Sequence, residues 1–162
     1  MIFVIELVIL CLLFTLVVVP ITLKNPLSMV HNYPTEIYEK VLELGLTDGV
    51  ENRKSKAFLI KRILAIIVLG ILFGLIVYFF NGANTFGKGA GYAYLLWIGI
   101  NWYDCIVLDW LWFCHSKKVM IPGTEGMKGY KDYWFHAKGA LWGMLLGIPS
   151  ALIAGIIVSI LS

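Results

Sequence analysis

Charged side chains are scarce in this sequence. Asp, Glu, Lys and Arg make up 14% of its 162 residues, whereas hydrophobic residues make up 60%, and the mean hydropathy is +0.85. A water-soluble domain has about 25% charged and about 45–50% apolar residues. The composition therefore excludes an ordinary soluble domain, and it provides enough apolar residues for several membrane spans.

Cysteine is also rare, and several catalytic motifs are absent. Cys11, Cys105 and Cys114 form no CxxC pair, and all three lie in apolar segments. An odd count at this spacing argues against a disulfide framework or a structural zinc site, so we interpret them as buried, reduced thiols. The HExxH metal motif is missing, and no Ser–His or Cys–His catalytic arrangement is apparent. Cys114 and His115 are neighbours in sequence, which points their side chains apart on a helix.

The sequence does contain four long apolar runs, at about 1–23, 60–80, 91–114 and 137–161. Each approaches the roughly 20 residues that cross a bilayer as a helix. The runs are too long for barrel strands, and open sheet edges cannot face lipid. The first run lacks a positive leading region and a cleavage site, so we expect it to be retained. The sequence predicts an all-α integral membrane protein in which residues 1–162 form a single four-transmembrane-helix bundle.

The distribution of basic residues predicts an orientation. Twelve of the thirteen Lys and Arg residues lie in the first and third loops or their flanks, and only Lys88 lies on the other side. The positive-inside rule makes the basic side cytoplasmic and places both termini outside. The small size and short loops favour a bacterial inner (plasma) membrane. The expected partner is the lipid bilayer, whose anionic lipids the basic side could hold, and we expect no nucleic acid partner.

The first loop contains an amphipathic segment, residues 34–46. Ile37, Val41 and Leu44 fall on one face at helical spacing. We expect a short cytoplasmic helix that lies on the membrane surface or covers the end of the bundle, either as plain packing or as a lid over a site. Residues 48–56 then form a polar link to the second span.

The last apolar run carries a ridge of small residues spaced four apart: Gly139, Gly143, Gly147, Ala151 and Gly155. Small residues let two helix backbones approach closely. The ridge is expected to pack inside the molecule against 60–80, where Gly70 and Gly74 match it, or against 1–23. The alternative is a seam with a second copy or with a partner membrane subunit.

The third apolar run is unusual because it carries two acids. On a helical wheel, Asn101, Asp104, Cys105, Asp109 and His115 fall within an arc of about 140°. Each acid costs roughly 2.5–3.5 kcal/mol inside a bilayer, so this face should point into the bundle, toward a cation, a basic side chain, protons or water. A structural alternative is that the acids accept hydrogen bonds from Trp or Tyr, are protonated, or cap the polar end of the bundle.

The third loop contains further ionisable side chains at the cytoplasmic end of the predicted bundle. His115 ends the third run, His136 begins the fourth, and Glu125 follows a tight turn at Ile121-Pro122-Gly123. With Asp109, these residues could form a site of two histidines and two carboxylates, a ligand set that suits zinc, iron or manganese.

Three functional hypotheses follow. The first is a binding, transport or sensing protein in which Asn101, Asp104, Asp109 and His115 take up a proton, a cation or a small polar ligand. The second is an interfacial enzyme that acts on a lipid-like substrate, with Glu125 and His136 among its acid–base groups or metal ligands. The third is a structural subunit of a larger membrane complex. The sequence does not decide whether the protein is an enzyme, and any cofactor stays unknown.

Overall fold

The computed structural model describes residues 2–47 and 56–162, and in these two stretches every regular element is a helix. The predicted all-α class is therefore confirmed for the described residues. The polar link expected over 48–56 lies outside them, apart from Lys56. The chain divides into two compact units, which are described separately below. The first comprises Met1–Leu10, Glu51–Asn101 and Leu141–Ser162, and the second comprises Cys11–Val50 and Trp102–Ala140.

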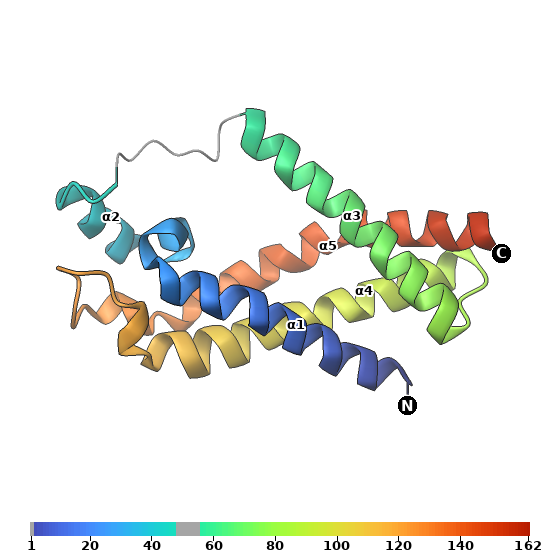
Figure 1. Cartoon of the computed structure of the whole chain (residues 1–162), viewed down its shortest axis with the longest axis horizontal. Coiled ribbons are helices and arrows are strands. Elements are labelled where there is room, and N and C mark those ends of the chain that lie inside the picture. The colour runs from blue at the N-terminus through green and yellow to red at the C-terminus, as the bar shows by residue number, and fades with distance from the viewer. Residues whose placement is uncertain (1, 48–55) are drawn as a thin grey trace. The chain divides into compact units, whose positions relative to one another are not determined.

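Three of the helices are long: α1 (Ile2–Lys24), α3 (Lys56–Asn81) and α5 (Tyr133–Leu161), all labelled in Figure 1. By length and composition, each of the three could cross a membrane. They coincide with the first, second and fourth apolar runs of the sequence.

The third apolar run has a different structure. It begins as α4 (Phe86–Tyr103), continues as a π-helix, η3 (Asp104–Trp112), and ends in a turn of 3₁₀-helix, η4 (Phe113–His115). The predicted helical character over 91–114 is therefore confirmed, but the helix type changes at Asp104. The regular α-helix ends at Tyr103, and α4 is not among the three helices that are long and apolar enough to span.

In the first unit, a turn after α3 leads into α4. Gly82 has φ +63°, and the amide of Ala83 donates to the carbonyl of Val77 at 3.1 Å, so a left-handed glycine follows the end of α3. The unit has an apolar core to which all of its helices contribute. Its fully buried members are Phe73, Val77, Ala83, Ala93, Leu96, Ala154 and Val158.

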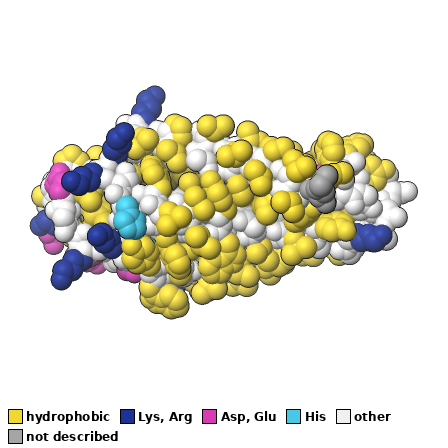
Figure 2. All heavy atoms as spheres, turned by 90° about the horizontal axis from the view of Figure 1, so that it is seen from below, with side chains coloured by type: hydrophobic (Ala, Val, Ile, Leu, Met, Phe, Trp, Pro, Cys, Tyr) yellow, Lys and Arg dark blue, Asp and Glu magenta, His cyan; other side chains and the backbone are white. Residues whose placement is uncertain are grey.

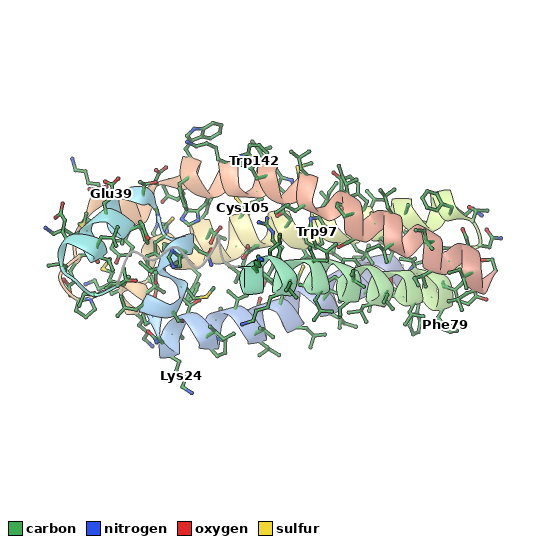
Figure 3. The ribbon with its side chains drawn as sticks, turned by 90° about the horizontal axis from the view of Figure 1, so that it is seen from above. Lys24, Glu39, Phe79, Trp97, Cys105 and Trp142 are labelled. Carbon is green, nitrogen blue, oxygen red and sulfur yellow. The ribbon has the colours of Figure 1, made fainter. Side chains whose placement is uncertain are left out.

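The small residues of α5 are used inside the first unit. A side chain added at Gly143, Gly147 or Gly155 would meet Asn101, Trp97 or Phe86 of α4, respectively. The Trp97 indole (labelled in Figure 3) also donates to the Gly143 carbonyl at 2.8 Å.

The match expected between the ridge of α5 and α3 is not observed. Gly70 and Gly74 do contact α5, but at Ile153 and Ile157, which are not members of the ridge. The Ser150 hydroxyl of α5 adds a hydrogen bond to the Ile66 carbonyl of α3 at 3.0 Å. Helix α5 therefore presents its small residues to α4 and a second set of residues to α3. Within the ridge, Gly139 differs because nothing lies within 4 Å of a side chain added there.

The second unit is built from short helices around one apolar cluster. These are η1 (Pro26–Asn32), α2 (Thr35–Glu43), η3, η4, η5 (Lys117–Val119) and η6 (Lys128–Lys131), together with the parts of α1 and α5 that belong to this unit. The amphipathic helix predicted over 34–46 corresponds to α2, and its Ile37 and Val41 are fully buried. Both belong to the apolar cluster, so the buried face of α2 packs on the other residues of this unit. Of the expected apolar face, only Leu44 is exposed.

The outer faces of the long helices are strongly apolar. Leu16 of α1, Phe79 of α3 and Ile160 of α5 are 69%, 67% and 73% exposed. Hydrophobic side chains cover much of the surface seen in Figure 2, whereas Lys and Arg side chains are few over the helices. Exposed apolar surface on this scale is typical of a protein face that contacts lipid or another protein.

Candidate functional site

The two acids of the third apolar run lie at successive turns of the π-helix. Asp104 begins η3, and Asp109 follows five residues later. In an α-helix, two residues five apart point about 140° away from each other. A π-helix forms hydrogen bonds between residues five apart and turns less per residue, so Asp104 and Asp109 come closer to the same side. Asp104 lies close enough to experience the charges of both Asp109 and His136.

Asp109 is paired with a residue far along the chain. Its Oδ2 lies 3.0 Å from Nδ1 of His136 on α5, and the side chains of His136 and Asp109 are 5% and 29% exposed. Asp132 fixes the start of α5, because its Oδ1 accepts a hydrogen bond from the amide of Phe135 at 2.9 Å. The N-terminal turn of α5 thus holds the imidazole against the π-helix.

The other face of the His136 ring is apolar. Phe113 and Phe135 contact the imidazole edge-on, with ring centroids 5.3 and 5.4 Å away. Nε2 of His136 is buried and makes no hydrogen bond in the described part of the chain. Nδ1 of the imidazole therefore binds a carboxylate, and Nε2 remains buried beside two aromatic rings.

Asp104 has no such partner. Its carboxylate is half-buried and accepts no hydrogen bond from the residues that the structure describes. The preceding residue, Tyr103, is anchored by its hydroxyl, which lies 2.8 Å from the hydroxyl of Thr15 on α1. Asp104 thus lies near the Asp109–His136 pair, and its carboxylate oxygens accept no hydrogen bond from the described residues.

The other predicted site residues lie elsewhere. Nδ1 of His115 is 3.0 Å from the Trp110 carbonyl, and its Nε2 is 3.5 Å from the Tyr133 hydroxyl. Glu125 accepts a hydrogen bond from the Gly123 amide at 2.7 Å. Among the described residues, no group of three or more His, Cys, Asp or Glu could hold a metal ion. The structure thus brings Asp109 and His136 together, but it does not bring His115 and Glu125 to them.

The turn predicted at Ile121-Pro122-Gly123 is confirmed. The Thr124 amide donates to the Ile121 carbonyl at 3.0 Å, and Gly123 has φ +86°. The turn leads to a buried hydrogen-bond circuit rather than to the acids. Ile121 N–H donates to the Tyr130 hydroxyl, which bonds to Thr124 Oγ1, and Thr124 in turn donates to the Ile121 carbonyl.

Asn101 belongs to the first unit, where its Oδ1 lies against Gly143 of α5. Its part in the predicted polar face stays a prediction. The first unit also contains an acid, Glu6, whose Oε2 accepts a hydrogen bond from the Asn81 amide at 2.6 Å. Its Oε1 is buried and makes no hydrogen bond among the described residues.

Sequence reasoning missed two features of the site. The first is the π-helix: the five-residue spacing of Asp104 and Asp109 was visible, but no local signal marks a change of helix type. The second is the packing of Phe113 on the His136 ring, because these residues lie in different elements. Searches against protein-family models, curated proteins and solved structures found no match to this chain.

Proposed function

We propose that this chain is a four-span integral membrane protein of the inner membrane. Its spans would be α1, α3, the continuous helical segment from α4 through η4, and α5. Three observations support this arrangement: the apolar outer faces of the helices, the length of the three regular spans, and the 30 residues from Phe86 to His115 that remain helical throughout. We infer the orientation from the positive-inside rule, which makes the loops rich in Lys and Arg cytoplasmic and places both termini outside.

We further propose that Asp104, Asp109 and His136 bind one positive charge, either a proton or a monovalent cation, and that the protein translocates it across the membrane. The observation that carries this proposal is the 3.0 Å Asp109–His136 pair with the unpaired Asp104 carboxylate beside it. If His136 is protonated, the three side chains carry a formal charge of −1. A net charge in a medium of low dielectric constant is costly unless it is neutralised, so the site favours a ligand that brings +1.

The helix type supports a binding role. π-helical turns are rare and occur frequently at functional sites, because they cost backbone stability and persist where they position side chains. Here the π-helix aligns two carboxylates that an α-helix would separate. His115, which lies in η4 directly after the π-helix, would exchange protons between the site and the cytoplasm.

The test is an ion-flux measurement on the full chain reconstituted in lipid vesicles that contain a trapped pH-sensitive dye. A potassium diffusion potential drives protons inward, and a parallel series with sodium and potassium gradients identifies a metal cation. The expected result is a flux that falls in Asp104→Asn to the level of empty vesicles, because this change removes the unneutralised charge.

Glu39→Gln is the matched control. Glu39 is an exposed acid of α2 (labelled in Figure 3), so its neutralisation should leave the flux unchanged. Equal fluxes in Asp104→Asn and Glu39→Gln, or no flux above empty vesicles in the unaltered protein, would contradict the proposal.

A further inference from the structure

Glu6 is an acidic residue near the start of α1, and within the first unit its carboxyl group meets the end of α3. Its Oε2 accepts a hydrogen bond of 2.6 Å from the side-chain amide of Asn81, the last residue of α3. Its Oε1 is buried and makes no hydrogen bond among the described residues. One oxygen of the carboxyl group is therefore satisfied, and the other is enclosed without a donor.

No basic side chain neutralises Glu6. It takes part in no salt bridge within the part of the chain that the structure describes. Lys88 of α4 directs its Nζ to the Asn84 Oδ1 at 3.1 Å. Arg62 lies near the opposite end of α3, roughly 28 Å from Asn81 at 1.5 Å per residue. The remaining ionisable side chains in the last turn of α3 and the first turns of α4 are the phenols of Tyr78 and Tyr92.

The end of α3 also disfavours a negative charge. The free carbonyl groups of a helix concentrate partial negative charge at its C-terminus. Helix α3 ends at Asn81 and has no basic residue in its last turn. An ionised Glu6 would therefore face the negative end of a helix with one oxygen buried and unpaired. The arrangement favours an occupant that removes the charge.

We propose that Glu6 and Asn81 form a proton-binding site at the outer end of the first unit. A proton on the carboxyl group cancels its charge, and the Asn81 amide holds the group in place through Oε2. Hard metal cations such as calcium require about six or more oxygen ligands, whereas a proton requires one acceptor. Oε1 has no polar partner among the described residues, so the proton is the ligand that fits.

The position of Glu6 gives protons a short path to the carboxyl group. Glu6 follows Ile2, the first residue of α1, by four positions, which is about 6 Å along the helix. Both Glu6 and Asn81 are partly exposed. A proton can therefore reach the carboxyl group from water at this end without a cavity. That this end is the outer one rests on the proposed topology, whereas the binding itself does not depend on Asp104.

The test uses the full-length protein in lipid vesicles and the apolar reagent dicyclohexylcarbodiimide. This reagent adds to protonated carboxyl groups in apolar surroundings and leaves a stable acylurea, which peptide mass mapping assigns to a residue. The expected result is a label on Glu6 at pH 6 that is lost as the pH rises to 9, because the reagent requires the protonated form.

Matched variants and an internal control sharpen the test. Glu6→Gln replaces the acid by a neutral side chain of the same shape and should remove this label. Glu39, an exposed acid of α2, should stay unlabelled. Asn81→Leu removes a donor that favours the charged form, so Glu6 should react about 10-fold faster at pH 9, since a hydrogen bond to a charged group is worth about that factor.

The outcomes separate this inference from the proposed translocation. Asp104→Asn should stop the ion flux and leave the Glu6 label, and loss of both would contradict a separate site. The inference is overturned if Glu6 is unlabelled at pH 6, if Glu39 reacts equally, or if the label does not depend on pH. Protection of Glu6 by sodium at constant pH would indicate a metal cation as the ligand and would also overturn it.

Discussion

Asp109 and His136 are joined at 3.0 Å between a π-helix and the first turns of α5. The partners differ in exposure, since His136 is almost fully enclosed and Asp109 is partly open. Removing one member of such a pair leaves a buried polar group unsatisfied, which costs more than the pair itself contributes. The pair therefore links the stability of the fold to the chemistry proposed for the site.

Breaking this pair should destabilise the protein. We expect His136→Gln and Asp109→Asn each to lower the free energy of unfolding by roughly 1–3 kcal/mol. The double variant should cost less than the sum of the two, since the residues interact directly. Thermal unfolding in detergent, monitored by circular dichroism, measures these changes, and Glu39→Gln serves as the control. Strict additivity of the two changes would show that the residues are not coupled.

The glycines of α5 should differ in their tolerance of a methyl group. At Gly147 an added side chain meets the Trp97 indole, so Gly147→Ala should cost about 1–3 kcal/mol through overpacking. At Gly139 nothing lies within 4 Å, and Gly139→Ala should gain about 0.5–1 kcal/mol from lower backbone entropy in the unfolded chain. Melting temperatures of the two variants test this contrast. A similar change in both would mean that α4 does not cover Gly147.

The buried circuit of the third loop should depend on one hydroxyl group. Tyr130→Phe removes the acceptor of the Ile121 amide and leaves that N–H buried without a partner. The expected loss is about 1–3 kcal/mol, with faster hydrogen exchange at the Ile121 amide. Tyr38→Phe is the matched control because the Tyr38 hydroxyl makes no hydrogen bond among the described residues. Unchanged exchange at Ile121 would argue against the circuit.

Tyr33 should make the second unit sensitive to alkaline pH. Burial raises the pKa of Tyr33 well above its usual range, and the neighbouring Tyr130 adds to this effect. Above about pH 10 the unfolded chain releases this proton while the folded chain retains it, so the free energy of unfolding falls as the pH rises. Unfolding measured from pH 9 to 12 should show a shallower decline in Tyr33→Phe than in Tyr38→Phe. Identical slopes would contradict the assignment.

The orientation can be tested with two lysine positions. In a background without the native cysteines, Lys88→Cys should react with a membrane-impermeant thiol reagent on intact cells. Lys118→Cys should react only after the cells are lysed, because the loop that contains it is predicted to be cytoplasmic. Labelling is detected by a shift in mass. Reaction of Lys118→Cys on intact cells would reverse the proposed topology.

The sequence by itself determined the helical class and the approximate position of each long helix. Inside a bilayer, a run of about 20 apolar residues can form backbone hydrogen bonds only with its own backbone. The helices α1, α3 and α5 therefore follow from composition and length. The burial of Ile37 and Val41 in α2 likewise follows from their spacing, because residues four apart share one face of a helix.

Tertiary structure decided how these elements combine. The ridge of α5 packs on α4 rather than α3. Which two helices pack together depends on the shape complementarity of both surfaces, and the spacing of small residues in one helix does not determine it. The change to a π-helix at Asp104 aligns two acids that an α-helix would separate. The contact of His136 with Asp109 joins residues from different elements. No local pattern encodes such a contact, because it forms only when the helices pack.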